Sequence, residues 1–185
     1  LVEPQSLGLG GPRFWSGIMK LQESTTLDGR ATAPMAATPT LFQDSFGAPL
    51  KFFDAVVGGL SVSTPGTPAL MATAQQRWGK LAWSALFSEA VSLADNGFTV
   101  SRRLAAMVSH DQKHLNQFPS TAAYFLPDGK PVKASDILHN PAYATSLRNL
   151  GGQRSKPSIL ARLLRVSSTL SRKHTAIRAC CHWTI

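Results

Sequence analysis

The chain has 185 residues, of which 43% are hydrophobic and 16% are charged, and its formal net charge is +9. This composition is typical of a globular protein with a sizeable core, and it argues against a chain that is disordered throughout. No apolar run approaches the roughly 20 residues that a membrane-spanning helix needs, so we expect no membrane span.

The positive charge is concentrated at one end of the chain. Residues 1–150 hold 12 Lys or Arg against 10 Asp or Glu, a net charge of +2, whereas residues 151–185 hold 7 Lys or Arg and no acid. A nucleic-acid-binding fold usually carries its basic residues on the folded surface, so we expect no nucleic-acid partner. The alternative is a non-enzymatic protein whose basic tail binds nucleic acid or an acidic membrane, although Trp183 is the only aromatic residue there.

The first predicted element is a strand over residues 25–28. Gly29 permits a tight turn at its end, from which Arg30 projects. We expect Asp28 to orient Arg30 or to cap the local backbone rather than to act as an acid or base.

The first predicted helix begins at Thr67, a favourable N-cap, with Pro68 at the first helical position and Gly79 as its stop. One face of this helix is predicted to hold Leu70, Ala74 and Trp78. The preceding Pro65-Gly66 is interpreted as part of the helix start and not as a catalytic element.

A second helix is predicted over residues 84–95, and Asn96-Gly97 is predicted to close it. Its core-facing positions are predicted to be Leu86, Ala90, Leu93 and Ala94.

Two further helices follow. Ser101 is predicted to cap the third, in which Leu104, Ala105, Val108 and Leu115 share a side. A turn is predicted at Pro127-Asp128-Gly129, and Asn140-Pro141 is predicted to open a fourth helix that ends near Gly151-Gly152.

The histidines and cysteines do not form a recognisable metal motif. His110 and His114 lie four residues apart, but no glutamate follows the first histidine as it does in zinc proteases. Cys180 and Cys181 are adjacent and lack the two-residue gap of structural zinc sites. We therefore assign no metal ligand and no cofactor, and we expect the two histidines to face solvent.

Several short motifs recur in the order found in one enzyme family. They are Val2-Glu3-Pro4-Gln5-Ser6 with Gly8, Gly10 and Gly11; Asp28-Gly29-Arg30 with Ala33-Pro34; Gly59 and Val62 before Pro65-Gly66-Thr67; and Gly79 to Trp83 before Ala94 and Gly97-Phe98. Their order and spacing cover about two thirds of the chain. In these features the sequence resembles the large subunit of gamma-glutamyltransferases, also called gamma-glutamyltranspeptidases or glutathione hydrolases.

The resemblance implies an α/β fold, the four-layer αββα sandwich of N-terminal nucleophile hydrolases. We expect residues 1–150 to form part of that sandwich, mostly helical with one or two strands. We expect residues 151–185 to be a basic tail that is non-native or disordered.

The resemblance also implies the chemistry, which is cleavage or transfer of the γ-glutamyl group of glutathione and related amides. The family's nucleophile is a threonine freed at the N-terminus of a second, small subunit when the precursor cuts itself. No such threonine can be assigned within these residues, so we assign no catalytic residue and expect the chain to be inactive without that small subunit. The resemblance further implies a periplasmic or secreted location, although the sequence shows no signal peptide.

Arg30 is the candidate substrate-binding residue. Its planar guanidinium can donate two parallel hydrogen bonds to a carboxylate, and the resemblance implies that it holds the α-carboxylate of the γ-glutamyl donor. Ala31 departs from the family pattern, in which a glutamate follows this arginine. The structural alternative is a surface arginine that ends a strand.

Two segments lose the family pattern abruptly, namely residues 12–24 and residues 151–185. One interpretation is a shift of the reading frame in the coding sequence. The other is a natural, shortened paralogue with a basic tail of its own.

Overall fold

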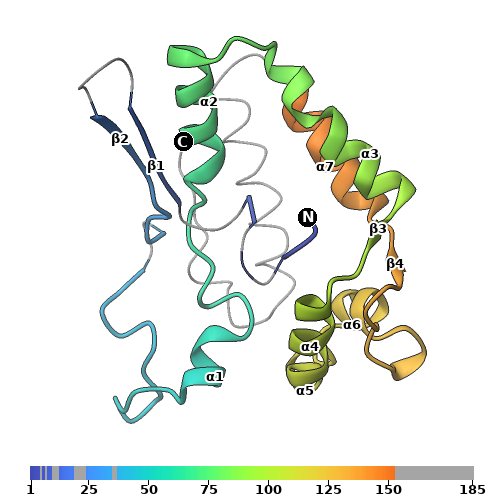
Figure 1. Cartoon of the computed structure of the whole chain (residues 1–185). Coiled ribbons are helices and arrows are strands. Elements are labelled where there is room, and N and C mark those ends of the chain that lie inside the picture. Colours follow the sequence, from blue (N-terminus) through green and yellow to red (C-terminus); the bar gives the residue numbers. More distant parts are fainter. Residues whose placement is uncertain (5, 7, 10–12, 19–23, 35–36, 153–185) are drawn as a thin grey trace. The chain divides into compact units, whose positions relative to one another are not determined.

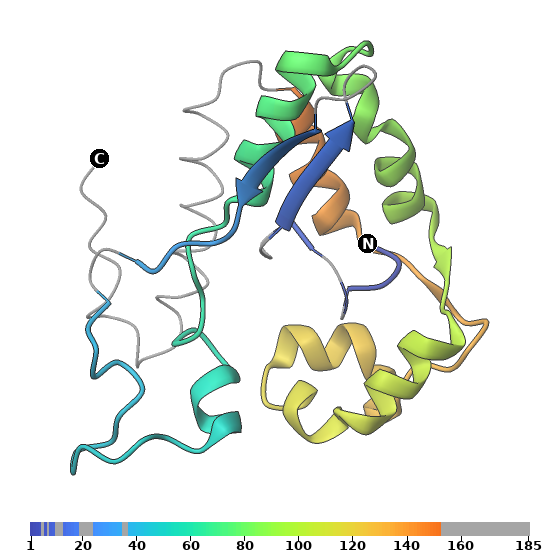
Figure 2. The ribbon, with the colours of Figure 1, turned by 60° about the vertical axis from the view of Figure 1, so that its left-hand side comes forward.

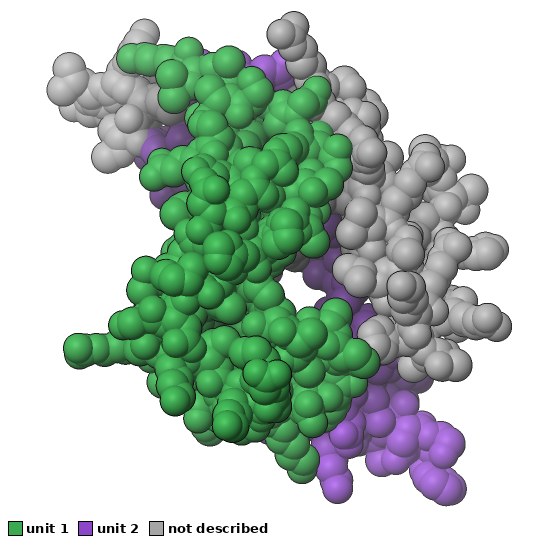
Figure 3. All heavy atoms as spheres, turned by 90° about the vertical axis from the view of Figure 1, so that its right-hand side faces the viewer, with its two compact units in different colours: residues 1–8, 80–154 green, residues 9–79, 155–185 purple. Residues whose placement is uncertain are grey.

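The structure, a computed structural model, describes residues 1–152 except 5, 7, 10–12, 19–23 and 35–36 (Figure 1). The basic tail, both cysteines and the Gly10-Gly11 pair lie outside the described residues. The described residues divide into two compact units, the first formed by residues 1–8 and 80–152 and the second by residues 9–79 (Figure 3).

The second unit is built on a β-hairpin. Strand β1 (Arg13–Ile18) pairs antiparallel with β2 (Ser24–Gly29), as Figure 2 shows. The register places Phe14 opposite Asp28. Strand β2 confirms the predicted strand. Strand β1 was not predicted, and it lies within residues 12–24, the segment expected to diverge from the family pattern.

Helix α2 (Thr67–Trp78) packs against β2 and confirms the first predicted helix. Trp78 stacks on Trp15 of β1 with ring centroids 4.6 Å apart. Gly79 ends the helix as predicted, and its N–H donates to the Gln75 carbonyl. The predicted N-cap is wrong, because Gly66 occupies that position and Thr67 is a buried residue of the first turn.

A short helix, α1 (Phe52–Val56), lies between the hairpin and α2 and was not predicted. None of its residues is buried, and Phe46 before it is 94% exposed. Because this helix has no buried face, its sequence shows no apolar periodicity from which the helix could be predicted.

The first unit contains a pair of packed helices, α3 (Ser88–Asn96) and α7 (Pro141–Gly151) (Figure 1). Ala94 and Ala144 are both fully buried, and such small side chains let helix backbones approach closely. Asp95 of α3 forms an ion pair with Arg148 of α7.

The helix predicted over residues 84–95 is only partly correct. A 3-10 helix, η1 (Trp83–Phe87), precedes α3, and Phe87 is the buried residue of this turn. Leu86 and Leu93, both predicted for the core, are 44% and 37% exposed. Ala94, also predicted for the core, is fully buried. The tighter 3-10 winding rotates the chain before α3 begins, so one helical period does not hold across both elements, and Phe87 is buried instead of Leu86.

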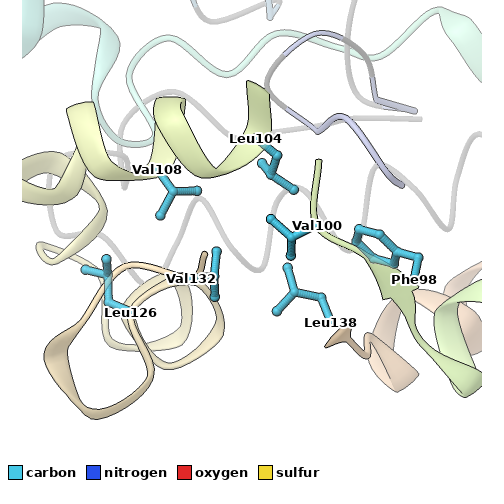
Figure 4. Close-up of a cluster of buried hydrophobic side chains, with 7 residues drawn as sticks. All are labelled: Phe98, Val100, Leu104, Val108, Leu126, Val132 and Leu138. Atoms are coloured by element: carbon cyan, nitrogen blue, oxygen red, sulfur yellow. The ribbon is translucent and has the colours of Figure 1, made fainter. Parts of the chain in front are cut away.

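The remaining elements of the first unit surround a cluster of buried hydrophobic side chains. They are β3 (Phe98–Thr99), α4 (Arg102–His110), α5 (Gln112–Leu115), α6 (Pro119–Phe125), η2 (Pro127–Gly129) and β4 (Ile137–Leu138). Strands β3 and β4 pair antiparallel. The core side chains, shown in Figure 4, are Phe98, Val100, Leu104, Val108, Leu126, Val132 and Leu138.

Three predictions of local geometry in this unit are confirmed. The Ser101 hydroxyl accepts a hydrogen bond from the Leu104 N–H at 3.0 Å, and the Asn140 side chain accepts one from the Tyr143 N–H at 2.9 Å. The predicted turn at residues 127–129 is η2, in which Asp128 and Gly129 both have positive φ. Leu115 lies beyond the end of α4, in α5.

The described residues form more helix than strand, as predicted, but the prediction of one or two strands is wrong. Four strands are present in the described part of the chain, in two antiparallel pairs. Among the described residues, no helix is long and apolar enough to cross a membrane.

Candidate carboxylate-binding site

Arg30 follows β2 directly, and its backbone is held by the residue two positions before it. The Arg30 N–H donates to Asp28 Oδ1 at 2.8 Å, which closes an Asx turn at the end of the strand. The Asp28 carboxylate is therefore used by the backbone, the capping role expected from the sequence. The Arg30 side chain is exposed.

Two glycines let the Arg30 backbone pack closely against the start of α2. A Cβ on Gly29, which is buried, would lie 2.5 Å from Leu70 Cβ. A Cβ on Gly66 would lie 2.5 Å from the Gly29 carbonyl oxygen and 2.7 Å from the Arg30 carbonyl oxygen. No real side chain fits at such distances without moving the backbone, so both positions require glycine.

A backbone bridge fixes the chain just after Arg30. The Thr32 N–H donates to the Thr64 carbonyl at 3.2 Å, and the Thr64 N–H donates back to the Thr32 carbonyl at 2.9 Å. Three contacts therefore fix the backbone around Arg30. They are the Asx turn at Asp28, the close approach of Gly66 and the Thr32–Thr64 bridge.

The Arg30 guanidinium lies over the aromatic ring of Phe14, with Cζ 5.8 Å from the ring centroid. Within the described residues, no carboxylate forms an ion pair with this guanidinium. An exposed guanidinium on a fixed backbone can receive an external carboxylate through two parallel N–H···O bonds. This is the chemistry that the site offers.

No nucleophile is assigned among the described residues of the site. Thr67, a hydroxyl residue in the first turn of α2, is 1% exposed, which leaves it out of reach of an external substrate. Among the described residues, no group of three or more His, Cys, Asp or Glu side chains could hold a metal ion. His110 is exposed, as expected, whereas His114 is half-buried with Nδ1 at 3.7 Å from Asp111 Oδ1.

Sequence reasoning found Arg30 and Asp28 but missed two residues that support them. Gly66 was interpreted only as part of a helix start, and its close approach to Arg30 joins segments more than 30 positions apart. Phe14 lies in residues 12–24, where no family motif was recognised in the sequence. The sequence could have revealed Phe14 if residues 13–18 had been predicted to pair with residues 24–29, because that pairing places Phe14 opposite Asp28.

The comparisons with known proteins identify one family. The family model described as Gamma-glutamyltranspeptidase matches residues 1–157. The chain is 35% identical over 143 residues to the glutathione hydrolase proenzyme of Bacillus subtilis (strain 168), and 30% identical over 154 residues to glutathione hydrolase 3 of Arabidopsis thaliana. These matches cover 75% and 83% of this chain but 24% and 23% of the relatives, so the chain spans about a quarter of their length.

Solved structures show the same fold. The γ-glutamyltranspeptidase of Helicobacter pylori superposes with a TM-score of 0.86 at 23% identity, over 99% of this chain and 53% of that one. The enzyme of Pseudomonas nitroreducens superposes with a TM-score of 0.75 at 24% identity, over 90% of this chain and 50% of that one.

Proposed function

The chain belongs to the gamma-glutamyltranspeptidase family, and we propose that its Arg30 binds the α-carboxylate of a γ-glutamyl donor such as glutathione. The observation that carries the proposal is the exposed Arg30 guanidinium, which has no carboxylate partner in the described part of the chain while its backbone is fixed by Asp28 and Gly66. A site for an external carboxylate needs both properties, because a fixed backbone lowers the entropy lost when the ligand binds.

The proposed reaction is cleavage or transfer of the γ-glutamyl group. Arg30 would hold the α-carboxylate and thereby place the γ-carbonyl for attack by a threonine of the small subunit. This chain would position the donor and would not perform the covalent step. The isolated chain is accordingly proposed to be inactive.

The wider setting of the chain is part of the same proposal. Residues 1–150 would contribute helices and strands to a four-layer αββα sandwich, and the protein would act in the periplasm or outside the cell. The fold of the solved relatives supports the first statement, and the family membership supports the second.

Replacing Arg30 by lysine tests the carboxylate role. Arg30→Lys keeps the charge but loses the planar pair of donors, so the affinity for glutathione is expected to fall about tenfold, the value of one charge-assisted hydrogen bond. The measurement is a glutathione titration of the 15N-labelled chain, followed by NMR through the amide signals of residues 28–32. Arg77→Lys, an exposed substitution in the same unit, is the matched control and is expected to leave the affinity unchanged.

A matched ligand makes the test specific for the α-carboxylate. The peptide γ-aminobutyryl-cysteinylglycine differs from glutathione only by lacking that group. The wild-type chain is expected to bind it about as weakly as the Arg30→Lys variant binds glutathione. Equal binding of the two peptides by the wild-type chain would refute the proposed role of Arg30.

A further inference from the structure

We propose that Phe14 is a positioning residue that holds the Arg30 guanidinium in the orientation that receives the carboxylate. This inference rests on the proposed function and assigns a specific role to a residue that no sequence motif singled out. It begins from the contact of the Arg30 guanidinium with the Phe14 ring, at 5.8 Å from Cζ to the ring centroid.

The backbone contacts of Arg30 do not determine where its guanidinium points. Asp28, Gly66 and the Thr32–Thr64 bridge all act on backbone atoms. The arginine side chain has several rotatable bonds beyond Cβ, and freezing an arginine side chain costs up to about 2 kcal/mol. An exposed arginine without a second contact would bear this cost when the carboxylate binds.

The hairpin register supplies that second contact. Phe14 of β1 lies directly opposite Asp28 of β2, and side chains of directly paired residues leave the same face of a two-stranded sheet. Arg30 follows Asp28 through the Asx turn just beyond the end of β2, and its guanidinium lies over the Phe14 ring. The register and the turn together bring the ring and the guanidinium into contact.

The contact leaves the guanidinium free to bind. A cation over the face of an aromatic ring is attracted by the ring's quadrupole, and the ring has no acceptor oxygen that would occupy the guanidinium N–H groups. Phe14 is 55% exposed, so it does not bury the cation. The ring can orient Arg30 without competing for the donors that the carboxylate needs.

Two substitutions separate the ring from the strand. Phe14→Ile keeps an apolar residue with strong strand preference but removes the ring, whereas Phe14→Tyr keeps the ring. A cation–π contact at an exposed site corresponds to about a two- to fivefold change in affinity. We therefore expect Phe14→Ile to weaken glutathione binding about two- to fivefold, and Phe14→Tyr to restore the wild-type affinity.

The test uses the full chain with 15N-labelled arginine, and the Arg30 Nε–Hε signal is assigned by its loss in Arg30→Lys. Without ligand, a ring over the guanidinium shifts this signal, so Phe14→Ile is expected to move it and Phe14→Tyr to leave it near its wild-type position. Glutathione is then titrated into each protein. A merely structural role of Phe14 would weaken binding in Phe14→Ile without moving the Arg30 Nε–Hε signal of the ligand-free chain.

The outcomes separate the two proposals. If the wild-type affinity for glutathione depends on Arg30 but is the same in Phe14→Ile, the positioning role is overturned and the carboxylate role stands. An Arg30 Nε–Hε signal that stays in place in Phe14→Ile also overturns the positioning role. Equal glutathione affinity of the wild-type chain and Arg30→Lys overturns the carboxylate role, and the positioning role with it.

Discussion

Gly66→Ala is expected to abolish detectable glutathione binding and to destabilise the second unit by about 3 kcal/mol, the upper end of the usual cost of overpacking. The added Cβ would lie 2.5 Å from the Gly29 carbonyl oxygen and 2.7 Å from the Arg30 carbonyl oxygen. Both obstacles are backbone atoms, which cannot rotate away as a flexible side chain can. The hairpin end that carries Arg30 must therefore move away from α2.

Backbone conformation does not account for this effect, because Gly66 has φ −95° and ψ −20°, which alanine adopts readily. The cost comes from lack of space alone. The measurements are urea unfolding, monitored by the amide signals of β2 and α2, and the glutathione titration. Gly8→Ala is the control, since a Cβ on Gly8 meets nothing within 4 Å and should change neither quantity. A Gly66→Ala chain with wild-type stability and affinity would contradict the described packing of Arg30.

Leu104→Ala is expected to lower the free energy of unfolding of the first unit by about 2–5 kcal/mol. Leu104 is 1% exposed and lies in the core formed by α4, β3, β4 and the segment around η2 (Figure 4). The substitution removes buried methyl groups and leaves a cavity that the surrounding side chains fill only in part. The loss is large because this core has only seven buried members among the described residues.

Urea unfolding measures this change in the free energy of unfolding of the first unit. Amide hydrogen exchange at Val100, Ala105 and Leu138 provides a second measurement in the same unit. Leu81→Ala is the matched control, because Leu81 belongs to the same unit but is 64% exposed. Its expected effect is within about 0.5 kcal/mol. Equal destabilisation by the two substitutions would show that residues 98–138 do not form the described core.

The sequence predicted best where a residue acts on its own neighbours. Ser101 and Asn140 cap helices through bonds to the N–H three positions later, and Gly97 and Gly79 end helices. These interactions depend on a few consecutive residues, so local patterns reveal them.

Elements that depend on distant partners were missed or misplaced. Strands β3 and β4 are each two residues long and are defined only by their pairing across nearly 40 positions. Helix α1 buries none of its residues, so it has no amphipathic period. Thr67 matches the side-chain preference for an N-cap, but it is buried, and the cap falls at Gly66, where the backbone approaches Arg30.

The candidate site was predictable to a similar extent. Arg30 and Asp28 belong to one short motif and were found from it. Their supports, Gly66 and Phe14, act through tertiary packing and hairpin register, which no local pattern specifies. Sequence reasoning therefore identified the candidate binding group but not the residues that contact it in the structure.

The central claim is that Arg30 binds the α-carboxylate of a γ-glutamyl donor, and an activity measurement in a chimeric enzyme tests it most directly. Residues 1–150 would replace the matching segment of the Bacillus subtilis glutathione hydrolase proenzyme, to which this chain is 35% identical over 143 residues. Cleavage of the chimeric precursor into two subunits reports correct folding. The rate of hydrolysis of a γ-glutamyl anilide then gives kcat and KM.

The Arg30→Lys chimera is expected to mature normally and to show a KM about ten times that of the unsubstituted chimera, whereas Arg77→Lys leaves KM unchanged. A matured Arg30→Lys chimera with unchanged KM and kcat would contradict the claim.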